Sequence, residues 1–147
     1  MVSVLLVEDH VAMGQAITRL LYKWGKVSVW ALVQSAESAL QELAASDDKT
    51  KATNPGNAVW PDLVLVDISL PGMSGIELVA ELQRLYPGLP CLMLSGYQEV
   101  HYVQRALDAG ARGYADKGDI VAITQAIEQV LDGKIYLSDE MREALTN

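Results

Sequence analysis

Basic residues, cysteines and long apolar runs are scarce in this chain. The 147 residues include 11 Lys+Arg against 19 Asp+Glu, a net charge of −8, so long-range electrostatics oppose approach to nucleic acid or anionic lipid. The single cysteine, Cys91, cannot form an internal disulfide, and its apolar neighbours predict a small buried hydrophobe. No apolar run approaches the roughly 20 residues of a membrane span, and the amino terminus lacks a signal peptide. We therefore expect a cytoplasmic chain that contacts no membrane and does not itself bind DNA.

The order of apolar and amphipathic segments predicts an α/β fold. The length corresponds to one domain, and half of the residues are hydrophobic, which is enough for a sizeable core. Apolar runs alternate with segments of helical period, as in βαβ units around a parallel sheet. Predicted strands cover residues 4–7, 27–32, 63–66, 91–94 and 113–115. The sum is a five-stranded (βα)₅ unit.

Apolar stripes and capping residues predict the helices between these strands. The first helix carries a stripe that ends at Gly25, formed by Ile17, Leu20, Leu21 and Trp24. Ala36, Ala39, Leu40 and Leu43 form the second stripe, up to about residue 45. Ser74 with Glu77 fits a capping box that opens the third helix. The fourth and fifth helices are marked by Val100, Val103 and Leu107, and by Ile120, Ile123, Ile127 and Val130.

Two connections stand out between these elements. Residues 46–60 have no period and contain a Pro-Gly turn signal, which predicts a tolerated insertion because surface loops lengthen at little cost. Trp60 is expected to anchor the end of this loop on the sheet. Pro71-Gly72 predicts a tight turn after the third strand.

Polar side chains follow four of the five predicted strands. Glu8 and Asp9 follow the first strand, Asp67 the third, Ser95 the fourth and Lys117 the fifth. The carboxyl ends of parallel strands meet at one edge of the sheet, where α/β proteins bind ligands. Three crowded carboxylates repel one another unless a cation joins them, and oxygen ligands beside a substrate phosphate suit Mg²⁺. The pattern therefore predicts a metal-assisted phosphoryl acceptor.

Four motifs, in this order and each after its own strand, resemble the receiver domain of two-component response regulators. They are Glu8-Asp9, the run DISLPGMSG at 67–75, Ser95-Gly96, and Tyr114-Ala115-Asp116-Lys117. The resemblance implies a flavodoxin-like, three-layer fold with sheet order 2-1-3-4-5. It also implies a receiver domain over residues 1–133, followed by the start of a linker or output-connecting helix over 134–147. The tail GKIYLS at 133–138 resembles the segment that joins receivers to helix-turn-helix output domains of the LuxR type.

The resemblance implies a role for each residue of the site. Asp67 would be the nucleophile that becomes an aspartyl phosphate. Asp9, Asp67 and the backbone carbonyl of Ser69 would bind Mg²⁺ directly, and Glu8 would act through water. Lys117 would pair with a phosphoryl oxygen, and before phosphorylation with the Asp67 carboxylate.

The same resemblance implies a switch and a set of partners. Ser95 would donate its hydroxyl to a phosphoryl oxygen, and Tyr114 would then move inward. The phosphoryl donor would be a sensor histidine kinase or a phosphotransfer protein. The output would be a changed surface on the fourth helix, fifth strand and fifth helix, with homodimerisation on phosphorylation and control of transcription through a C-terminal output domain beyond this chain. Gly118 stands where many receivers carry proline, so a cis-proline constraint cannot hold this loop.

Three other interpretations compete with this one. An aspartate-nucleophile phosphohydrolase would carry a second Asp two residues after the nucleophile, but Ser69 stands there. A flavodoxin-like cofactor binder would carry a Gly-rich loop after the first strand, where this chain has Glu8-Asp9-His10. His10 could also be read as a metal ligand, but imidazole suits softer metals than Mg²⁺, so an exposed residue opening the first helix is expected. The sequence therefore favours a signalling switch over a turnover enzyme.

Overall fold

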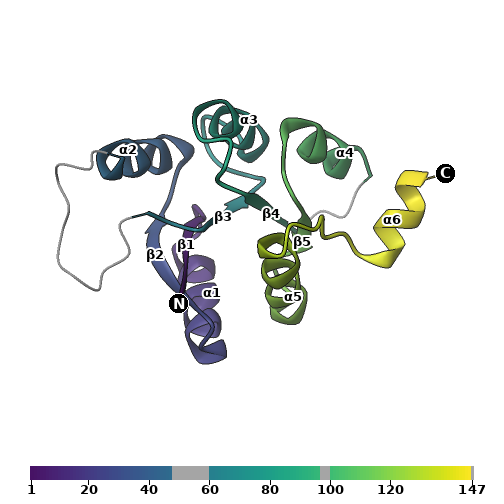
Figure 1. The fold of residues 1–147 in the computed structure, drawn as a ribbon, viewed down its shortest axis with the longest axis horizontal. Helices are drawn as coiled ribbons and strands as arrows, with labels where there is room; N and C mark the ends of the chain where they lie inside the picture. Colours follow the sequence, from purple (N-terminus) through teal and green to yellow (C-terminus); the bar gives the residue numbers. More distant parts are fainter. Residues whose placement is uncertain (48–59, 97–99, 147) are drawn as a thin grey trace.

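The computed structural model describes residues 1–47, 60–96 and 100–146 (Figure 1). Its strands are β1 (Val2–Val7), β2 (Val27–Val33), β3 (Leu63–Asp67), β4 (Cys91–Ser95) and β5 (Tyr114–Asp116). They form one parallel sheet in the order β2-β1-β3-β4-β5. The predicted fold class and strand order are therefore confirmed.

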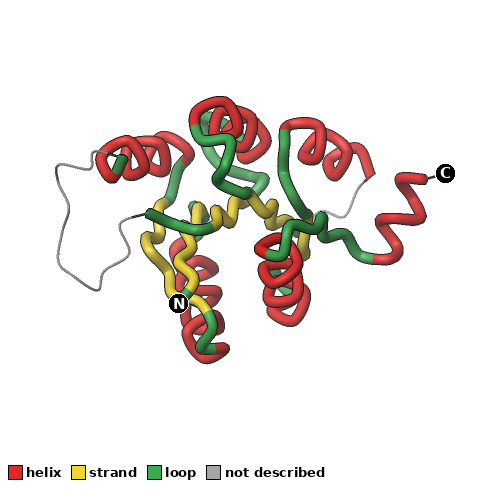
Figure 2. Tube along the Cα trace, viewed as in Figure 1, coloured by secondary structure: helices red, strands yellow, loops and turns green. Residues whose placement is uncertain are grey.

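Helices cover both faces of this sheet, giving three layers (Figures 1 and 2). The helices are α1 (Val11–Trp24), α2 (Ala36–Ser46), α3 (Gly75–Leu85), α4 (Val100–Ala109), α5 (Ile120–Leu131) and α6 (Asp139–Thr146). Helices α2, α3 and α4 pack on one face, and α1 and α5 pack on the other. None of the helices in the described ranges is long and apolar enough to span a bilayer.

The strands are apolar on both sides because both of their faces are covered. Alternate residues of β1 and β3 point to opposite faces: Leu5 and Val64 pack toward α2 and α3, whereas Leu6 and Leu65 pack toward α1 and α5. All four are fully buried. Cys91 is fully buried as predicted, and burial raises the pKa of its thiol to about 12. The apolar runs in the sequence are thus the buried centre of the sheet.

Local capping explains where several helices begin and end. The hydroxyls of Ser35 and Ser74 accept hydrogen bonds from the backbone N–H groups of Ser38 and Glu77, which confirms the predicted start of α3. Gly25 ends α1 in the left-handed conformation that glycine adopts without strain. The predicted stripe of α1 is wrong at Leu20, which is 40% exposed. The buried face of α1 runs through Gly14, Ile17 and Leu21, and this places Leu20 at its edge.

The predicted insertion overlaps the end of α2, which reaches Ser46, and residues 48–59 lie outside the described ranges. Trp60 packs against the core and meets the ring of Tyr86, just past α3, edge to face at 5.0 Å between centroids. The predicted anchor on the sheet therefore also contacts the end of α3. Next to it, Asp62 and Ser3 exchange two hydrogen bonds of 2.7 and 2.8 Å, which fix the entry into β3.

The chain returns to the sheet after α5. Tyr136 forms an isolated parallel bridge with Gly113, directly before β5, and α6 then packs beside α4. Met141 of α6 is only 5% exposed and belongs to the same core cluster as α4. The last helix is therefore packed against the domain in this structure.

Candidate functional site

The carboxyl ends of the strands are aligned at one edge of the sheet. Beyond the strands, the ladder continues through three backbone hydrogen bonds: Glu8 N–H to Val33 at 2.9 Å, Ile68 N–H to Leu94 at 3.0 Å and Lys117 N–H to Ser95 at 3.1 Å. These bonds determine where each polar side chain leaves the sheet. Residues far apart in the sequence thereby meet at one place.

Lys117 lies between two buried carboxylates. Its Nζ atom is 3.4 Å from Asp67 Oδ2 and 3.5 Å from Glu8 Oε1. Asp67 and Glu8 are 1% and 2% exposed, and the Lys117 side chain is 20% exposed. Both separations are long for charge-assisted hydrogen bonds, which are typically about 2.7–2.9 Å. One lysine therefore offsets two nearly buried carboxylates incompletely.

Burial is the first cause of an unusual pKa at Glu8. Removal from water, followed by a hydrogen bond to Asp67 and the negative charge of Asp67, raises the pKa of this carboxyl to about 8 against the opposing effect of Lys117. The raised pKa favours the protonated form of Glu8 at neutral pH in the metal-free protein. Glu8 is a poor anion until a cation replaces that proton.

The pKa of Asp67 is shifted in the opposite direction, below its ordinary value. Burial alone would raise the pKa of its carboxyl, but hydrogen bonds from Glu8 and from the Ser69 backbone N–H at 3.1 Å, together with Lys117, lower it overall. The charges of Asp67 and Glu8 raise the pKa of Lys117 against the effect of its burial. Asp67 is thus an ionised carboxylate in a nearly dry site, which is the state that a nucleophile needs.

Asp9 contributes an oxygen that the described residues leave unsatisfied. Its Oδ1 atom is buried and accepts no hydrogen bond from the part of the chain that the structure covers. A buried carboxylate oxygen without a partner is costly, and a bound cation removes this cost. Hard oxygen donors in a small region are the donor set that Mg²⁺ takes. The residues present therefore fit a divalent cation.

His10 lies beside this donor set. Ligand atoms of Glu8, Asp9 and His10 lie within 4.8 Å of one another. However, the His10 side chain is 75% exposed, and its Nδ1 atom is 3.8 Å from Asp9 Oδ1. His10 stands immediately before α1, as predicted. The oxygens of the carboxylates suit a hard cation better than this imidazole does.

The two residues predicted to form a switch lie on neighbouring strands. Ser95 ends β4, is fully buried and pairs with Asp116 of β5. Tyr114 pairs with Met93 of β4 and is 2% exposed. Its side chain belongs to the core cluster under α3 and α4.

Gly75 is the last residue of the 67–75 motif, but the sequence alone assigned it no role in positioning Asp67. A Cβ atom at Gly75 would overlap the backbone carbonyl oxygen of Asp67 and would lie 2.9 Å from the Ile68 Cα atom. The Gly75 N–H also bonds to the Ile68 carbonyl at 3.2 Å. The start of α3 thus packs directly on the Asp67 backbone. A glycine directly after a capping serine was the available signal.

Aspartates hold the loop that carries Lys117. The Asp116 carboxylate accepts from the Gly118 N–H at 2.9 Å, and the Asp119 carboxylate caps α5 by accepting from the Ala122 N–H at 3.1 Å. These local bonds position the chain on both sides of Lys117. They supply the constraint that Gly118 cannot.

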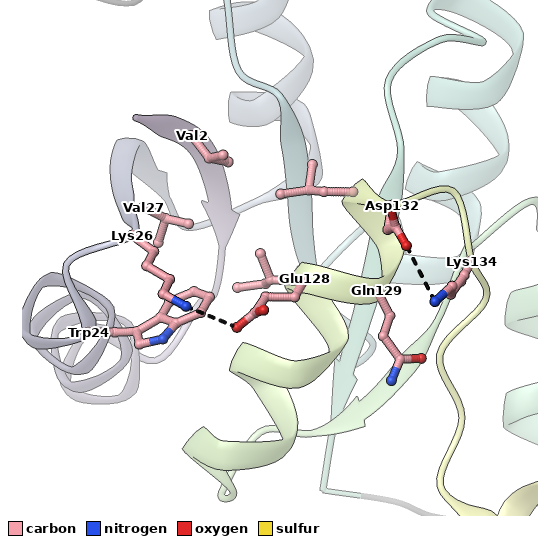
Figure 3. A pocket seen from close by; sticks show the side chains of 10 residues that line it. Val2, Trp24, Lys26, Val27, Glu128, Gln129, Asp132 and Lys134 are labelled. Atoms are coloured by element: carbon pink, nitrogen blue, oxygen red, sulfur yellow. Dashed lines mark ion pairs between the residues drawn. The ribbon is translucent and has the colours of Figure 1, made fainter.

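A broad pocket lies at the opposite end of the sheet (Figure 3). Val2 and Val27, the first residues of β1 and β2, line it together with Trp24. Its charges are exposed and paired, since Lys26 lies 3.7 Å from Glu128 and Lys134 lies 3.3 Å from Asp132. Lys26 also lies 5.6 Å from the centre of the Trp24 ring. This pocket contains none of the predicted site residues.

Comparisons with known proteins agree with the geometry. The family model described as the response regulator receiver domain matches residues 4–128. Response regulator GacA of Pseudomonas viridiflava is 30% identical over 146 residues, which are 99% of this chain and 62% of GacA. Response regulator UvrY of Escherichia coli O157:H7 is 29% identical over 146 residues, or 99% of this chain and 61% of UvrY. The chain spans about three fifths of the length of these curated relatives.

Solved structures give the same result for the fold. A two-component response regulator of the LuxR family from Aurantimonas sp. SI85-9A1 superposes with a TM-score of 0.80 at 27% identity, covering 96% of this chain and 92% of that one. The isolated receiver domain of RcsB from Salmonella enterica serovar Typhimurium, with the phosphomimetic BeF3−, superposes at 0.79 and 18% identity, covering 97% and 96%. At that identity it shows the fold alone. This chain belongs to the receiver domain family of two-component response regulators.

Proposed function

We propose that Asp67 is the phosphorylation site of this receiver. Phosphorylation of an aspartate is the general function of the family. The observation that carries the proposal is the buried Asp67 carboxylate, whose pKa is lowered and which lies 3.4 Å from the Lys117 Nζ atom at the edge of the sheet where Glu8 also ends. A carboxylate oxygen of Asp67 attacks phosphorus, the bond to the donor breaks, and its electron pair leaves with the donor. Lys117 then pairs with a phosphoryl oxygen.

The neighbouring residues prepare Asp67 for this step. The Ser69 N–H and Lys117 orient the carboxylate, and Gly75 allows α3 to approach its backbone. Receiver domains generally bind Mg²⁺ at an acidic pocket. Here Asp9, Asp67 and the Ser69 carbonyl would hold the ion directly, and Glu8 through water. When bound, Mg²⁺ supplies positive charge that offsets repulsion between an anionic donor and Asp67.

The partners follow from this chemistry. We infer that a sensor histidine kinase or a phosphotransfer protein supplies the phosphoryl group in the cytoplasm. The relatives GacA and UvrY are response regulators that extend beyond the region matched here. Residues 1–133 would be the receiver and 134–147 the start of the connection to an output domain, which would control transcription. Phosphorylation would favour a homodimer.

Intact mass after incubation with acetyl phosphate and Mg²⁺ tests the assignment. The parent should gain one phosphoryl mass, and this gain should disappear with EDTA or in Asp67→Asn. Asp132→Asn, at the opposite end of the sheet, is the matched control and should be labelled like the parent. A labelled Asp67→Asn protein, or labelling that EDTA does not affect, would overturn the assignment.

The proposed switch runs through Ser95 and Tyr114. Phosphoryl oxygens would draw the Ser95 hydroxyl and leave space for the ring of Tyr114, shifting a population between two states. Beryllofluoride, whose fluorines stand in for phosphoryl oxygens, should change the amide NMR shifts of α4 and β5. Ser95→Ala should still bind it but transmit smaller shifts. Equal shifts in the parent and Ser95→Ala would show that another route carries the signal.

The negative charge of the chain leads to a second test of its partners. With a net charge of −8, this chain should not bind duplex DNA by itself. Titration at low salt should show no saturable binding. Tight binding would place a DNA-contacting surface on the receiver itself.

A further inference from the structure

The end of the chain is hydrogen-bonded to the strand that carries Tyr114. We define residues 134–146 as the C-terminal arm. The Tyr136 N–H bonds to the Arg112 carbonyl at 3.0 Å, and the Tyr114 N–H bonds to the Tyr136 carbonyl at 3.1 Å. A Cβ atom at Gly113 would lie 3.1 Å from the Tyr136 carbonyl oxygen, so glycine permits this close approach. The arm thus adds a short sixth piece to the edge of the sheet.

The second half of the arm is packed on α4. Met141 is 5% exposed and lies in the same buried cluster as Val103 and Ala106 of α4 and the ring of Tyr114. Leu137, Ala144 and Leu145 pack partly buried against this cluster. Figure 1 shows α6 on the α4 side of the molecule, at the edge of the fold beyond β5. The arm therefore covers part of the α4–β5 face.

Local bonds hold the arm in this shape. The Ser138 hydroxyl accepts from the Met141 N–H at 3.2 Å and caps α6. The Arg142 guanidinium donates to the Ile135 carbonyl at 2.9 Å, which ties α6 back to the preceding segment. The bridge at Tyr136 and the buried side chain of Met141 thus belong to one folded piece.

We propose that the C-terminal arm docks on the α4–β5 face and that its docking is coupled to the occupancy of the phosphorylation site through Tyr114. This inference rests on the proposed function. Tyr114 contacts the arm through its backbone N–H, which bonds to the Tyr136 carbonyl, and its side chain belongs to the same buried cluster as Met141 and α4. A change that favours the buried ring favours the packing around Met141 as well. Coupling between two sites is reciprocal, so docking must also favour occupancy.

The direction of the coupling follows from the arrangement. Tyr114 is buried while the arm is docked. Phosphoryl oxygens that draw Ser95 make room for the ring and so stabilise this same arrangement. Occupancy of the site is therefore expected to hold the arm more tightly and to orient whatever follows it.

Amide hydrogen exchange measures the docking. In the parent, Mg²⁺ with beryllofluoride should slow exchange at the Tyr136 N–H and at residues 142–146. In Met141→Ala, exchange at these amides should be faster without any ligand, because burial of the Met141 side chain is lost. Glu143→Ala changes an exposed residue of the same helix and should behave like the parent.

Binding affinity measures the coupling from the other end. Met141→Ala should bind beryllofluoride about fivefold more weakly than the parent or Glu143→Ala, the low end of typical couplings between sites. Arg142→Ala is a milder variant that removes the bond to Ile135 and leaves the core unchanged. It should show a smaller loss in the same direction, and it keeps the test usable if Met141→Ala unfolds.

The outcomes separate this inference from the proposed function. Equal arm exchange in the parent, Met141→Ala and Arg142→Ala would show that the arm is not docked. If beryllofluoride changes the amide NMR shifts near Asp67 but leaves hydrogen exchange in the arm unchanged, the coupling alone is overturned. A lack of shifts near Asp67 in the parent would overturn the proposed function, and the coupling with it.

Discussion

The carboxylates at the two ends of the sheet differ in burial and in pairing. At the carboxyl end, Glu8 and Asp67 are almost fully buried and share one lysine, while Asp9 keeps a buried oxygen that accepts no hydrogen bond from the described residues. At the amino end, each carboxylate around the pocket of Figure 3 has its own lysine and lies in water. A pocket of about 520 Å³ lies at the amino end and one of about 510 Å³ lies beside His10 and Lys117 at the carboxyl end, so the buried carboxylates, and not the size of a pocket, distinguish the two ends.

This difference shows which property identifies a functional site. Exposed ion pairs such as Lys26–Glu128 contribute roughly 0–1 kcal/mol and can be lost with little effect. Buried charge without full compensation is costly and persists where it serves binding or reaction. The contrast predicts that equivalent substitutions at the two ends have very different effects.

The largest effect is expected at Gly75. Gly75→Ala forces a methyl group against the Asp67 carbonyl, so the strand end or α3 must shift. Overpacking of this kind costs typically 1–3 kcal/mol, and we expect about 3 kcal/mol with loss of labelling by acetyl phosphate. Urea denaturation and intact mass measure both. Gly88→Ala, where a Cβ atom meets nothing within 4 Å, is the control, and equal losses in the two variants would refute close packing on Asp67.

Magnesium should stabilise the parent through the carboxyl end. At a concentration 100 times its Kd, an ion that binds only the folded state adds about 2.7 kcal/mol. Asp9→Asn should lose most of this gain but be more stable than the parent without Mg²⁺, by on the order of 1 kcal/mol, because one repulsive charge is removed. Thermal melts with and without Mg²⁺ test both statements. Asp132→Asn should respond to Mg²⁺ like the parent, and a metal-free Asp9→Asn less stable than the parent would show that its charge is already compensated.

Metal-free stability should fall between about pH 4.5 and pH 8 because of Glu8. The pKa of this carboxyl is raised to about 8, mainly by burial, from an ordinary value of 4.5. Its stabilising contribution is therefore complete below the unfolded pKa and is lost as pH rises through the folded one. We expect a loss of at least about 1 kcal/mol, the value of one pKa unit. Glu8→Gln should remove most of the change in the urea midpoint between pH 5 and pH 8.5, whereas Glu128→Gln should leave that change as it is in the parent.

The smallest effects are expected at the amino end. Lys26→Ala removes an exposed ion pair with Glu128 and a contact with the Trp24 ring. The expected change in unfolding free energy is below about 1 kcal/mol, with acetyl phosphate labelling unchanged. Denaturation in low and high salt measures it. Loss of labelling in this variant would mean that the two ends are coupled and would break the comparison.

Much of the fold could be predicted because its signals are local. The apolar runs of β1, β3 and β4, the Ser74 cap and the turn at Gly72 each follow from a few neighbouring residues. Leu20 was predicted wrongly because its burial depends on how α1 is rotated against the sheet. The roles of the site residues remain predictions: Glu8, Asp9, Asp67, Ser69, Ser95, Tyr114 and Lys117.

By itself, the sequence determined that five strands would alternate with helices and that Glu8, Asp9, Asp67, Ser95 and Lys117 would follow the strand ends. It did so because secondary structure and strand ends are read from residues close together in the chain. Only the tertiary structure decided how much each carboxylate is buried, that Gly75 packs on the Asp67 backbone, and that Met141 is buried in the cluster that includes α4 and Tyr114. These features depend on which atoms of distant segments come into contact. The same contacts exclude water from Glu8, and this raises the pKa of its carboxyl.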